Sequence, residues 1–322
     1  MARAALTPRS RGHAPLAAFR GAAIVMAMLL AAFAATIAVT LLWQQQRWIG
    51  EHEHRRDQVQ AQALAMAGVQ WARQVLNDNV RANAVVHLGQ PWALRLPPTP
   101  IENGSVSGFM IDAQSKLNVN NLAASGNAAS AMQIALRRLF QQIGVPLTLI
   151  AAIGDWVDAD DRVGGPGGAE DAYYRSQDPP ALAANAPIRR ITELQSVRGV
   201  EPVMLGRMRP YLDALDGPIA INVNTAPPEV LMAVAGGLDA EGAAILVAAR
   251  DEAPFTSIAD FRARLPRQNL IVDESLIDVR SHWFIVTIEA RQGDTLARAR
   301  ALLKRSSTSA NAWPEIVWQT IE

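Results

Sequence analysis

A run of 22 residues without a charge, a proline or a glycine, Ala22 to Trp43, constrains this chain more than any other feature. At about 1.5 Å per residue it would form a helix of roughly 33 Å, which is enough to cross a hydrocarbon core of about 30 Å. The run ends in Leu41-Leu42-Trp43, which is typical of a membrane interface and unlike the small-residue cleavage site of a secretory signal peptide. We therefore expect a membrane helix that stays in the mature protein.

A short basic leader precedes the apolar run and ends in Arg20-Gly21. By the positive-inside rule its arginines place the N-terminus in the cytoplasm, so the bulk of the chain would face the periplasm of a Gram-negative cell. The leader arginines are Arg3, Arg9, Arg11 and Arg20. A glycine behind a basic leader indicates cleavage on the cytoplasmic side, between Gly21 and Ala22, and a single-pass protein of the bacterial inner membrane.

This junction resembles the type IV prepilin signal, in which a dedicated peptidase cuts after the glycine. With Ala22 as the first mature residue, the fifth is Met26, where most pilin-like subunits carry glutamate. In that family the glutamate of an incoming subunit pairs with the N-terminal ammonium of the subunit above it, because an unpaired charge is costly in an apolar interior. A subunit with no predecessor needs no such glutamate, so Met26 favours a tip or initiator subunit.

The composition agrees with a globular body outside the cytoplasm. The chain has 322 residues, enough for two domains with cores of their own. Its 30 basic and 30 acidic residues balance, so no global field draws it to nucleic acid or anionic lipid. It has no cysteine, which excludes disulfides, thiolate catalysis and cysteine-bound zinc.

The helix should continue beyond the membrane, because no proline occurs between Glu51 and Asn79. An apolar stripe over Leu64, Gly68, Trp71 and Val75 predicts one face packed against a small domain. The proline-rich stretch Pro91–Pro100 then breaks the helix.

Strand-like pieces at Val106–Ile111 and Leu117–Val119 precede a helical block of about 150 residues. A hairpin around Gln292-Gly293-Asp294 and a last strand at Ile316–Ile321 follow it. The order predicts an α+β fold, with a long helix on an antiparallel sheet and a large inserted all-helical domain of helix-hairpin-helix or SAM-like units. The expected parts are a leader over 1–21, a membrane segment over 22–43, a first pilin-like part over 44–125, an inserted helical domain over 126–280 and C-terminal strands over 281–322.

The helices expected within the block are Ala128–Ile143, Leu147–Val157, Thr192–Val197, Glu201–Leu215, Pro228–Val234, Ala240–Ala249 and Ser257–Leu265. A short internal echo runs through it, since Lys116–Asn121 resembles Ala220–Thr225 and each precedes an apolar helical stretch. Two short matches leave both duplication and chance open.

Six carboxylates lie within 17 residues and are interrupted by the glycine-rich loop Gly164–Gly168. Calcium takes six to eight oxygen ligands, and crowded carboxylates on flexible loops supply them. The spacing does not fit an EF-hand, so a solvated acidic loop with aspartate caps remains the alternative. The carboxylates are Asp155, Asp158, Asp160, Asp161, Glu170 and Asp171.

The stretch Ile221–Arg250, followed by Pro254–Phe261, resembles a helix-hairpin-helix module, a small fold that often binds DNA phosphates. Asp239 and Glu241 at the hairpin would satisfy the following helix dipole internally and repel phosphate. This favours a helix-packing module, with a membrane-anchored periplasmic DNA receptor as the competing hypothesis. No sequence motif for catalysis stands out, and the histidines of Glu51-His52-Glu53-His54 cannot share a helix face as a metalloprotease pair does.

Taken together, the chain is similar to the K-type minor pseudopilins of type II secretion systems. The resemblance is carried, in order, by Arg20-Gly21 with Met26, Asp155–Asp160, Gly168–Tyr174, Glu193–Gly199, Ile221–Pro227 and the hairpin Trp283–Leu303. It implies a non-enzymatic subunit that caps or initiates the pseudopilus driving folded proteins across the outer membrane.

The resemblance also implies partners and a cofactor. The partners would be the I- and J-type minor pseudopilins, the major pseudopilin, the inner-membrane assembly platform and the prepilin peptidase. Members of the family bind calcium in the inserted domain. That role transfers to Asp158, Asp160, Glu170 and Asp171, with Asp155 in support.

Overall fold

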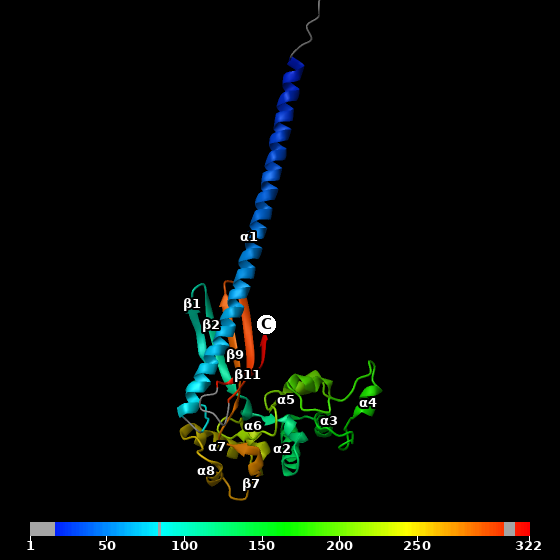
Figure 1. Ribbon diagram of the computed structural model, residues 1–322, viewed down its shortest axis with the longest axis vertical. Coiled ribbons are helices and arrows are strands. Elements are labelled where there is room, and N and C mark those ends of the chain that lie inside the picture. The colour runs from blue at the N-terminus through cyan, green and yellow to red at the C-terminus, as the bar shows by residue number, and fades with distance from the viewer. Residues whose placement is uncertain (1–16, 83–84, 306–312) are drawn as a thin grey trace, which may run out of the picture. The chain divides into compact units, whose positions relative to one another are not determined.

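The computed structural model of the chain describes residues 17–82, 85–305 and 313–322. Residues 1–16 of the predicted leader, with Arg3, Arg9 and Arg11, lie outside the described residues, as does the side chain of Arg20. The chain divides into two compact units, Met1–Asp57 and Gln58–Glu322. One helix, α1 (Ala17–Ala82), begins in the first unit and ends in the second (Figure 1).

In its described residues the first unit is the part of α1 from Ala17 to Asp57, which contains the apolar run. The side chains from Ala22 to Trp48 are exposed, and among them are Ile24, Leu29, Phe33 and Trp43. By length and composition this helix could cross a membrane, as the sequence predicts.

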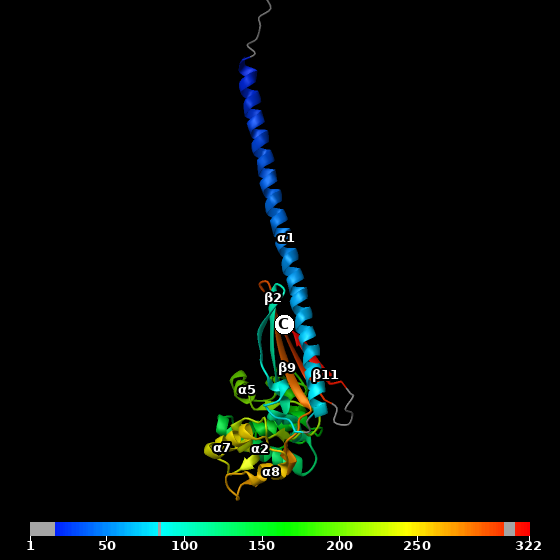
Figure 2. The same cartoon turned by 90° about the vertical axis from the view of Figure 1, so that its left-hand side faces the viewer.

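The second unit begins with the remaining turns of α1, which lie along one face of a five-stranded antiparallel sheet (Figure 2). The strand order is β1-β2-β9-β10-β11. The strands are β1 (Leu96–Ile101), β2 (Gly104–Asp112), β9 (Trp283–Gln292), β10 (Thr295–Lys304) and β11 (Glu315–Ile321). Strands from the two ends of the unit therefore make one sheet, and about 170 residues are inserted between β2 and β9.

Small residues let α1 approach this sheet closely. The fully buried side chains of the helix are Ala61, Ala65, Val69, Ala72 and Leu76. A Cβ on Gly68 would come within 2.7 Å of Ile288 Cγ2 on β9, so this position needs glycine at the observed spacing.

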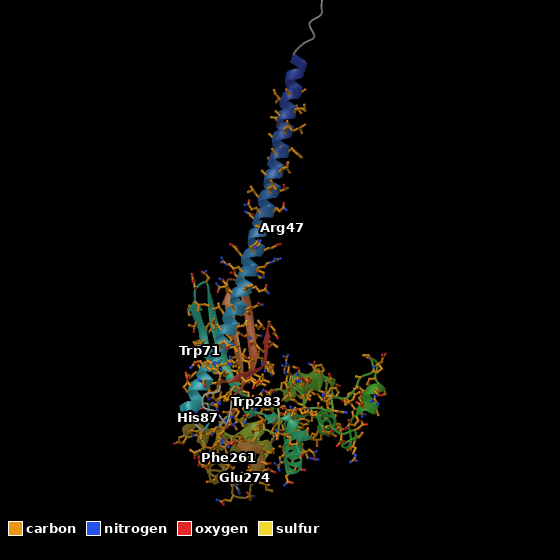
Figure 3. The ribbon with its side chains drawn as sticks, in the orientation of Figure 1. Arg47, Trp71, His87, Phe261, Glu274 and Trp283 are labelled. Carbon is orange, nitrogen blue, oxygen red and sulfur yellow. The ribbon has the colours of Figure 1, made fainter. Side chains whose placement is uncertain are left out.

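The predicted stripe on α1 was partly wrong. Gly68 does face the sheet, and Leu64 and Val75 are half-buried beside it, but the Trp71 side chain is 56% exposed (Figure 3). The buried face of α1 is shifted by one residue from the predicted stripe. Alanines pack against the sheet, whereas the prediction placed the bulkier side chains there.

The insert between β2 and β9 packs around its own core, at one end of the sheet (Figure 1). Its α-helices are α2 (Asn127–Ile143), α3 (Thr148–Val157), α4 (Asp171–Arg175), α5 (Pro202–Met208), α6 (Pro228–Val234), α7 (Ala240–Glu252) and α8 (Ile258–Ala263). Short 3₁₀ turns occupy Pro91–Ala93, Ala113–Ser115, Val119–Ala123, Ile191–Ser196 and Glu274–Leu276.

Three pairs of two-residue strands lie within this mostly helical insert. They are β3 (Leu117–Asn118) with β4 (Leu212–Asp213), β5 (Ile221–Asn222) with β8 (Ile277–Asp278), and β6 (Ala235–Gly236) with β7 (Ile271–Val272). The helix predicted over Glu201–Leu215 was therefore wrong beyond Met208, because the chain turns there and pairs with β3. The proline-rich stretch that was read only as a helix breaker contains β1, an edge strand, where proline is tolerated.

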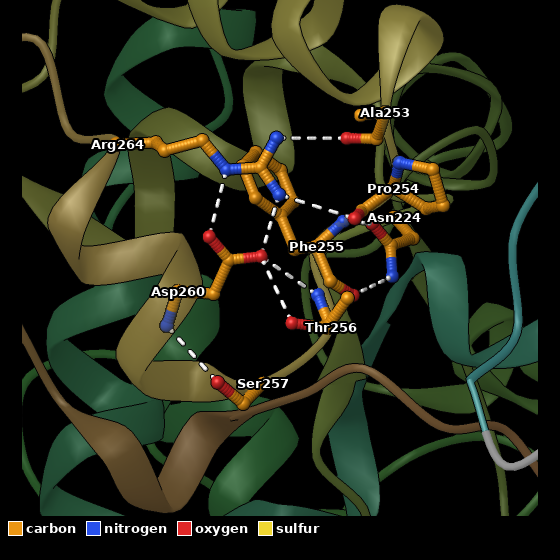
Figure 4. A network of polar contacts seen from close by, with 8 residues as sticks. All are labelled: Asn224, Ala253, Pro254, Phe255, Thr256, Ser257, Asp260 and Arg264. Atoms are coloured by element: carbon orange, nitrogen blue, oxygen red, sulfur yellow. Dashed lines mark hydrogen bonds and ion pairs between the residues drawn. The ribbon is translucent and has the colours of Figure 1, made fainter.

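The structure supports duplication within the insert. The parallel pairs β3–β4 and β5–β8 begin and end two segments that repeat the same hydrogen bonds. Asn120 holds the backbone N–H and C=O of Ile188 at 3.0 and 2.9 Å, and Asn224 holds those of Phe255 at 2.8 and 2.9 Å (Figure 4).

The closing strands repeat as well. The Ala214 N–H donates to Asp213 at 2.9 Å, and the Val279 N–H donates to Asp278 at 2.7 Å. We call residues 115–217 the first repeat and residues 221–280 the second repeat.

Candidate metal centre

The acidic loop is an extension that only the first repeat carries. In the second repeat α7 ends at Glu252, and Phe255 follows after Ala253-Pro254. In the first repeat α3 ends at Val157, and the equivalent residue, Ile188, follows only after residues 158–187. The carboxylates singled out in the sequence lie at the end of α3 and in this extension.

Three of these carboxylates converge. Asp158, Asp160 and Glu170 each offer an oxygen, and these oxygens lie within 4.8 Å of one another. Ligands on opposite sides of one calcium ion, each 2.3–2.6 Å from it, are about 5 Å apart, so the spacing fits a shared cation.

Several of the carboxylate oxygens are buried without a protein donor. Within the described part of the chain, both Glu170 oxygens, Asp158 Oδ1 and Asp155 Oδ2 have no hydrogen-bond partner. Glu170 is only 3% exposed and Asp155 only 1%. Because buried polar atoms are nearly always paired, this set of unpaired anionic oxygens matches the donor set of a hard cation.

The electrostatics of the cluster point the same way. Burial, together with the negative charges of Asp155, Asp158, Asp161 and Asp160, raises the pKa of Glu170 to about 7. Burial also raises the pKa values of Asp158 and Asp155. A cation between the carboxylates would remove this penalty, because its charge favours their ionised forms.

Asp155 lies at the edge of the trio, in a space shaped by two glycines. Its Oδ1 accepts the N–H of Gly164 at 2.9 Å. A Cβ on Gly168 would approach Asp155 Oδ2 to 2.3 Å, and one on Gly164 would approach Oδ1 to 2.6 Å. The glycines therefore leave the room that this carboxylate occupies.

Asp171 is placed differently from the other predicted ligands. Its Oδ2 pairs with Arg175 at 2.6 Å, and its Oδ1 accepts the N–H of Ala183 at 3.1 Å. It lies at the first position of α4 and is not one of the three converging residues.

Arg198, which the sequence reading missed, holds the loop from outside. Its guanidinium donates to the Gly168 carbonyl at 3.0 Å and stacks over Tyr173 at 4.4 Å. Its backbone N–H donates to the Tyr174 hydroxyl at 3.1 Å, and Tyr174 contacts Trp156 edge-on. The only sequence signal for Arg198 is that it lies within Glu193–Gly199, a segment that carries part of the family resemblance.

In the helix-hairpin-helix segment, the polar groups of the hairpin already bond to other groups of the second repeat. Asp239 caps α7 by accepting the N–H of Gly242 at 2.9 Å, and it pairs with Arg267 at 2.7 Å. The amide that a phosphate would bind is thus already paired, and the nearby arginine is neutralised. This geometry favours the packing interpretation of the module.

The predicted processing site lies within α1 in the first unit. Gly21 and Ala22 are both helical, and Ala22 and Met26 are exposed. The exposed His52 lies edge-on to Trp48, with ring centroids 4.3 Å apart.

The chain is similar to a known protein family and to individual proteins of that family. Residues 115–217, which contain the β3–β4 pair, and residues 221–280, which contain the β5–β8 pair, match the family described as type II secretion system (T2SS), protein K. A type II secretion system protein K of Aeromonas hydrophila is 32% identical over 69% of this chain and 73% of that protein. The corresponding protein of Klebsiella pneumoniae is 29% identical over 89% of this chain and 92% of that protein.

A solved structure resembles the whole fold. One chain of the crystal structure of a GspK–GspI–GspJ complex from enterotoxigenic Escherichia coli superposes with a TM-score of 0.71. The similarity covers 86% of this chain and 99% of that chain, at 22% identity. The predicted α+β architecture with its helical insert is confirmed.

Proposed function

The chain belongs to the type II secretion system protein K family, and from that premise we propose that it is a non-enzymatic minor pseudopilin at the tip of the pseudopilus. It would assemble with I- and J-type minor pseudopilins above the major pseudopilin, and help initiate or cap the fibre. The observation that carries this proposal is the family match over both repeats together with the apolar start of α1.

Three features support the tip position. Met26 provides no carboxylate to pair with a subunit above it. The insert lies at the end of the sheet and would obstruct further addition there (Figure 1). The solved structure with a similar fold is a complex with I- and J-type proteins.

The proposal places the chain in the bacterial inner membrane by a single helix, with its N-terminus cytoplasmic and its bulk periplasmic. The prepilin peptidase would cut between Gly21 and Ala22, and the assembly platform would receive the product. Mass spectrometry of the chain from cells with an active peptidase should find Ala22 at the N-terminus. A Gly21→Ala variant should keep its leader, and maturation of that variant would refute the assignment.

Association provides the second test. The full chain, co-expressed in detergent-solubilised membranes with the I- and J-type subunits of the same genome, should co-purify with both in a defined ratio. Failure to bind either subunit would contradict the tip role.

We also propose that the acidic loop binds one calcium ion through Asp158, Asp160 and Glu170, with Asp155 in support. When bound, the ion supplies positive charge that neutralises the carboxylates. The residues themselves tie three points of the chain together: the end of α3, the loop after it and the residue before α4.

Melting of the chain in calcium and in chelator tests this proposal, because an ion that binds only the folded state raises the melting temperature by mass action. Asp160→Asn should abolish most of the shift, whereas the adjacent Asp161→Asn should preserve it, since Asp161 is outside the converging trio. Equal shifts in the two variants would exclude this ligand set.

A further inference from the structure

Each repeat has a groove beside its asparagine-clamped segment. In the first repeat the groove of about 560 Å³ runs between Arg189-Arg190 and Ala214. In the second repeat the groove of about 680 Å³ runs between Thr256-Ser257 and Val279. The walls correspond, because Arg189-Arg190 follows the clamped Ile188 and Thr256-Ser257 follows the clamped Phe255.

The first groove lies between the first repeat and the protein's own sheet. Trp283 and Leu302 of the sheet line it, together with Val317 and Trp318 of β11 (Figure 3 labels Trp283). The Arg190 guanidinium stacks over the Trp318 ring at 5.1 Å. Leu302, Trp283 and Trp318 pack with Leu215 at the end of the first repeat in a small core of their own.

The second groove has walls at the corresponding positions, with Thr256-Ser257 in place of the two arginines and no sheet against them. Among the described residues, its lining from outside the second repeat is Val85 alone. Ile258 is half-buried and Ala259 is exposed within it. Most of the exposed lining is apolar, so the surface is suited to an apolar side chain from another chain.

The rim of the second groove is polar and balanced in charge. Arg262 pairs with Glu274, and Arg280 pairs with Asp278 at 3.2 Å. The arginines and Glu274 are more than half exposed. An apolar centre with a charge-neutral polar rim is the anatomy of a protein interface and fits an uncharged partner surface, whereas nucleic acid would require a basic one.

We propose that this second groove, between α8 and the segment after β8, docks the sheet of a neighbouring minor pseudopilin through an aromatic or branched apolar side chain near its edge. The occupant follows from the first repeat, where one wall of the equivalent groove is a tryptophan on an edge strand of a pilin-like sheet. The inference rests on the proposed function, since it names the surface through which this subunit meets its partners.

The test measures the affinity of the full chain, in detergent, for the I- and J-type subunits. Ala259→Arg fills the groove from an exposed helical position, so it should leave the fold intact and weaken binding at least tenfold, or about 1.4 kcal/mol. Ala248→Arg is the matched control, because it places the same side chain on an exposed position of α7 outside the groove. Its affinity should equal that of the wild type.

A second variant and a second measurement keep the test independent of folding. Arg280→Glu reverses one exposed charge on the rim and should weaken binding several-fold. A photo-crosslinking residue at position 259 should label the I- or J-type subunit, and the same residue at position 248 should not. Wild-type affinity in both groove variants, with the partners bound, would overturn the docking surface and leave the proposed function standing. Absence of binding by the wild-type chain would overturn both.

Discussion

A buried carboxylate joins the sheet to the second repeat, and removing it should have a large effect on stability. Asp112, at the end of β2, is 2% exposed. Its Oδ2 accepts the hydroxyls of Ser281 at 2.5 Å and Thr225 at 2.6 Å and the Asn222 amide at 3.1 Å. Its Oδ1 accepts the Gln114 N–H at 2.8 Å.

Asp112→Ala would deprive two donors of their acceptor, the Ser281 hydroxyl and the Gln114 N–H. Thr225 retains the Asn222 carbonyl at 3.3 Å. Each orphaned buried donor costs about 1–3 kcal/mol. Burial raises the pKa of Asp112, because a buried carboxylate loses its hydration. Removing the charge removes this desolvation penalty and offsets part of the loss in stability.

Arg305 changes the balance again. It is 6% exposed, and burial lowers its pKa to about 10, while the charge of Asp112 opposes that shift. Losing Asp112 leaves this guanidinium without that nearby negative charge. We expect a net loss of about 3 kcal/mol in the free energy of unfolding.

Urea titration of the detergent-solubilised chain, followed by tryptophan fluorescence, measures the loss as a lower midpoint at unchanged slope. Asp273→Ala is the matched control, because Asp273 accepts the Ser275 N–H at 3.0 Å in the same local geometry but is exposed. It should cost only about 0.5–1 kcal/mol.

Asp112→Asn should rescue part of the loss, since its amide oxygen can still accept the Gln114 N–H and the hydroxyls of Ser281 and Thr225 can rotate to accept its NH₂ group. A midpoint for Asp112→Ala equal to that of the control would refute the account of this junction.

Three further predictions concern the acidic loop and the helix. Gly168→Ala should weaken calcium binding at least tenfold, because the added Cβ would displace Asp155. Gly154→Ala is the control, because its added Cβ would meet no atom within 4 Å, and it should bind calcium as the wild type does. Calorimetric titration measures both affinities. The pKa of Glu170 is raised from 4.5 to about 7, so between these values the calcium-free folded state binds more protons than the unfolded state. The free energy of unfolding in chelator should therefore fall as the pH rises from about 4.5 to 7. Calcium affinity should rise over the upper part of this range, because Glu170 ionises there. Gly68→Ala should destabilise the second unit by about 1–3 kcal/mol through its clash with Ile288, and Gly206→Ala, in the open on α5, should stabilise it by about 0.5–1 kcal/mol in the same urea assay.

Local chemistry made much of the fold predictable from the sequence. The turn Gln292-Gly293-Asp294 joins β9 and β10 as predicted, with Gly293 at a φ of 54°. The helix at Pro228–Val234 has the predicted bounds, because proline opens it and its buried face is periodic. These features depend on neighbours within a few residues.

Long-range pairing set the limits of prediction. β4 pairs with a strand about 95 residues earlier, and only that partner makes Leu212–Asp213 extended. The junction at Asp112 gave no signal, since Asn222, Thr225 and Ser281 reach it from distances of 110 to 169 residues along the chain. A lone aspartate at a strand end reads as an ordinary surface residue.

The carboxylate density of the acidic loop was visible in the sequence, but the choice among its members was not. Asp158, Asp160 and Glu170 meet because a turn brings the start of α4 back to the end of α3. Asp171 is adjacent to Glu170, yet it pairs with Arg175 one helical turn later. Whether neighbouring carboxylates point inward or outward depends on that local helix geometry.

The repeats explain why a cation would be useful at this place. The first repeat closes over residues 158–187, where the second needs only Ala253-Pro254, and a loop about fifteen times longer costs roughly 2.4 kcal/mol more to close. Calcium at a hundred times its dissociation constant would contribute about 2.7 kcal/mol, which offsets that cost. Replacing residues 158–187 by Ala-Pro removes all three converging carboxylates and should therefore give a chain whose melting temperature is the same with and without chelator. A melting temperature of the replacement chain that still depends on chelator would place the calcium site outside these residues.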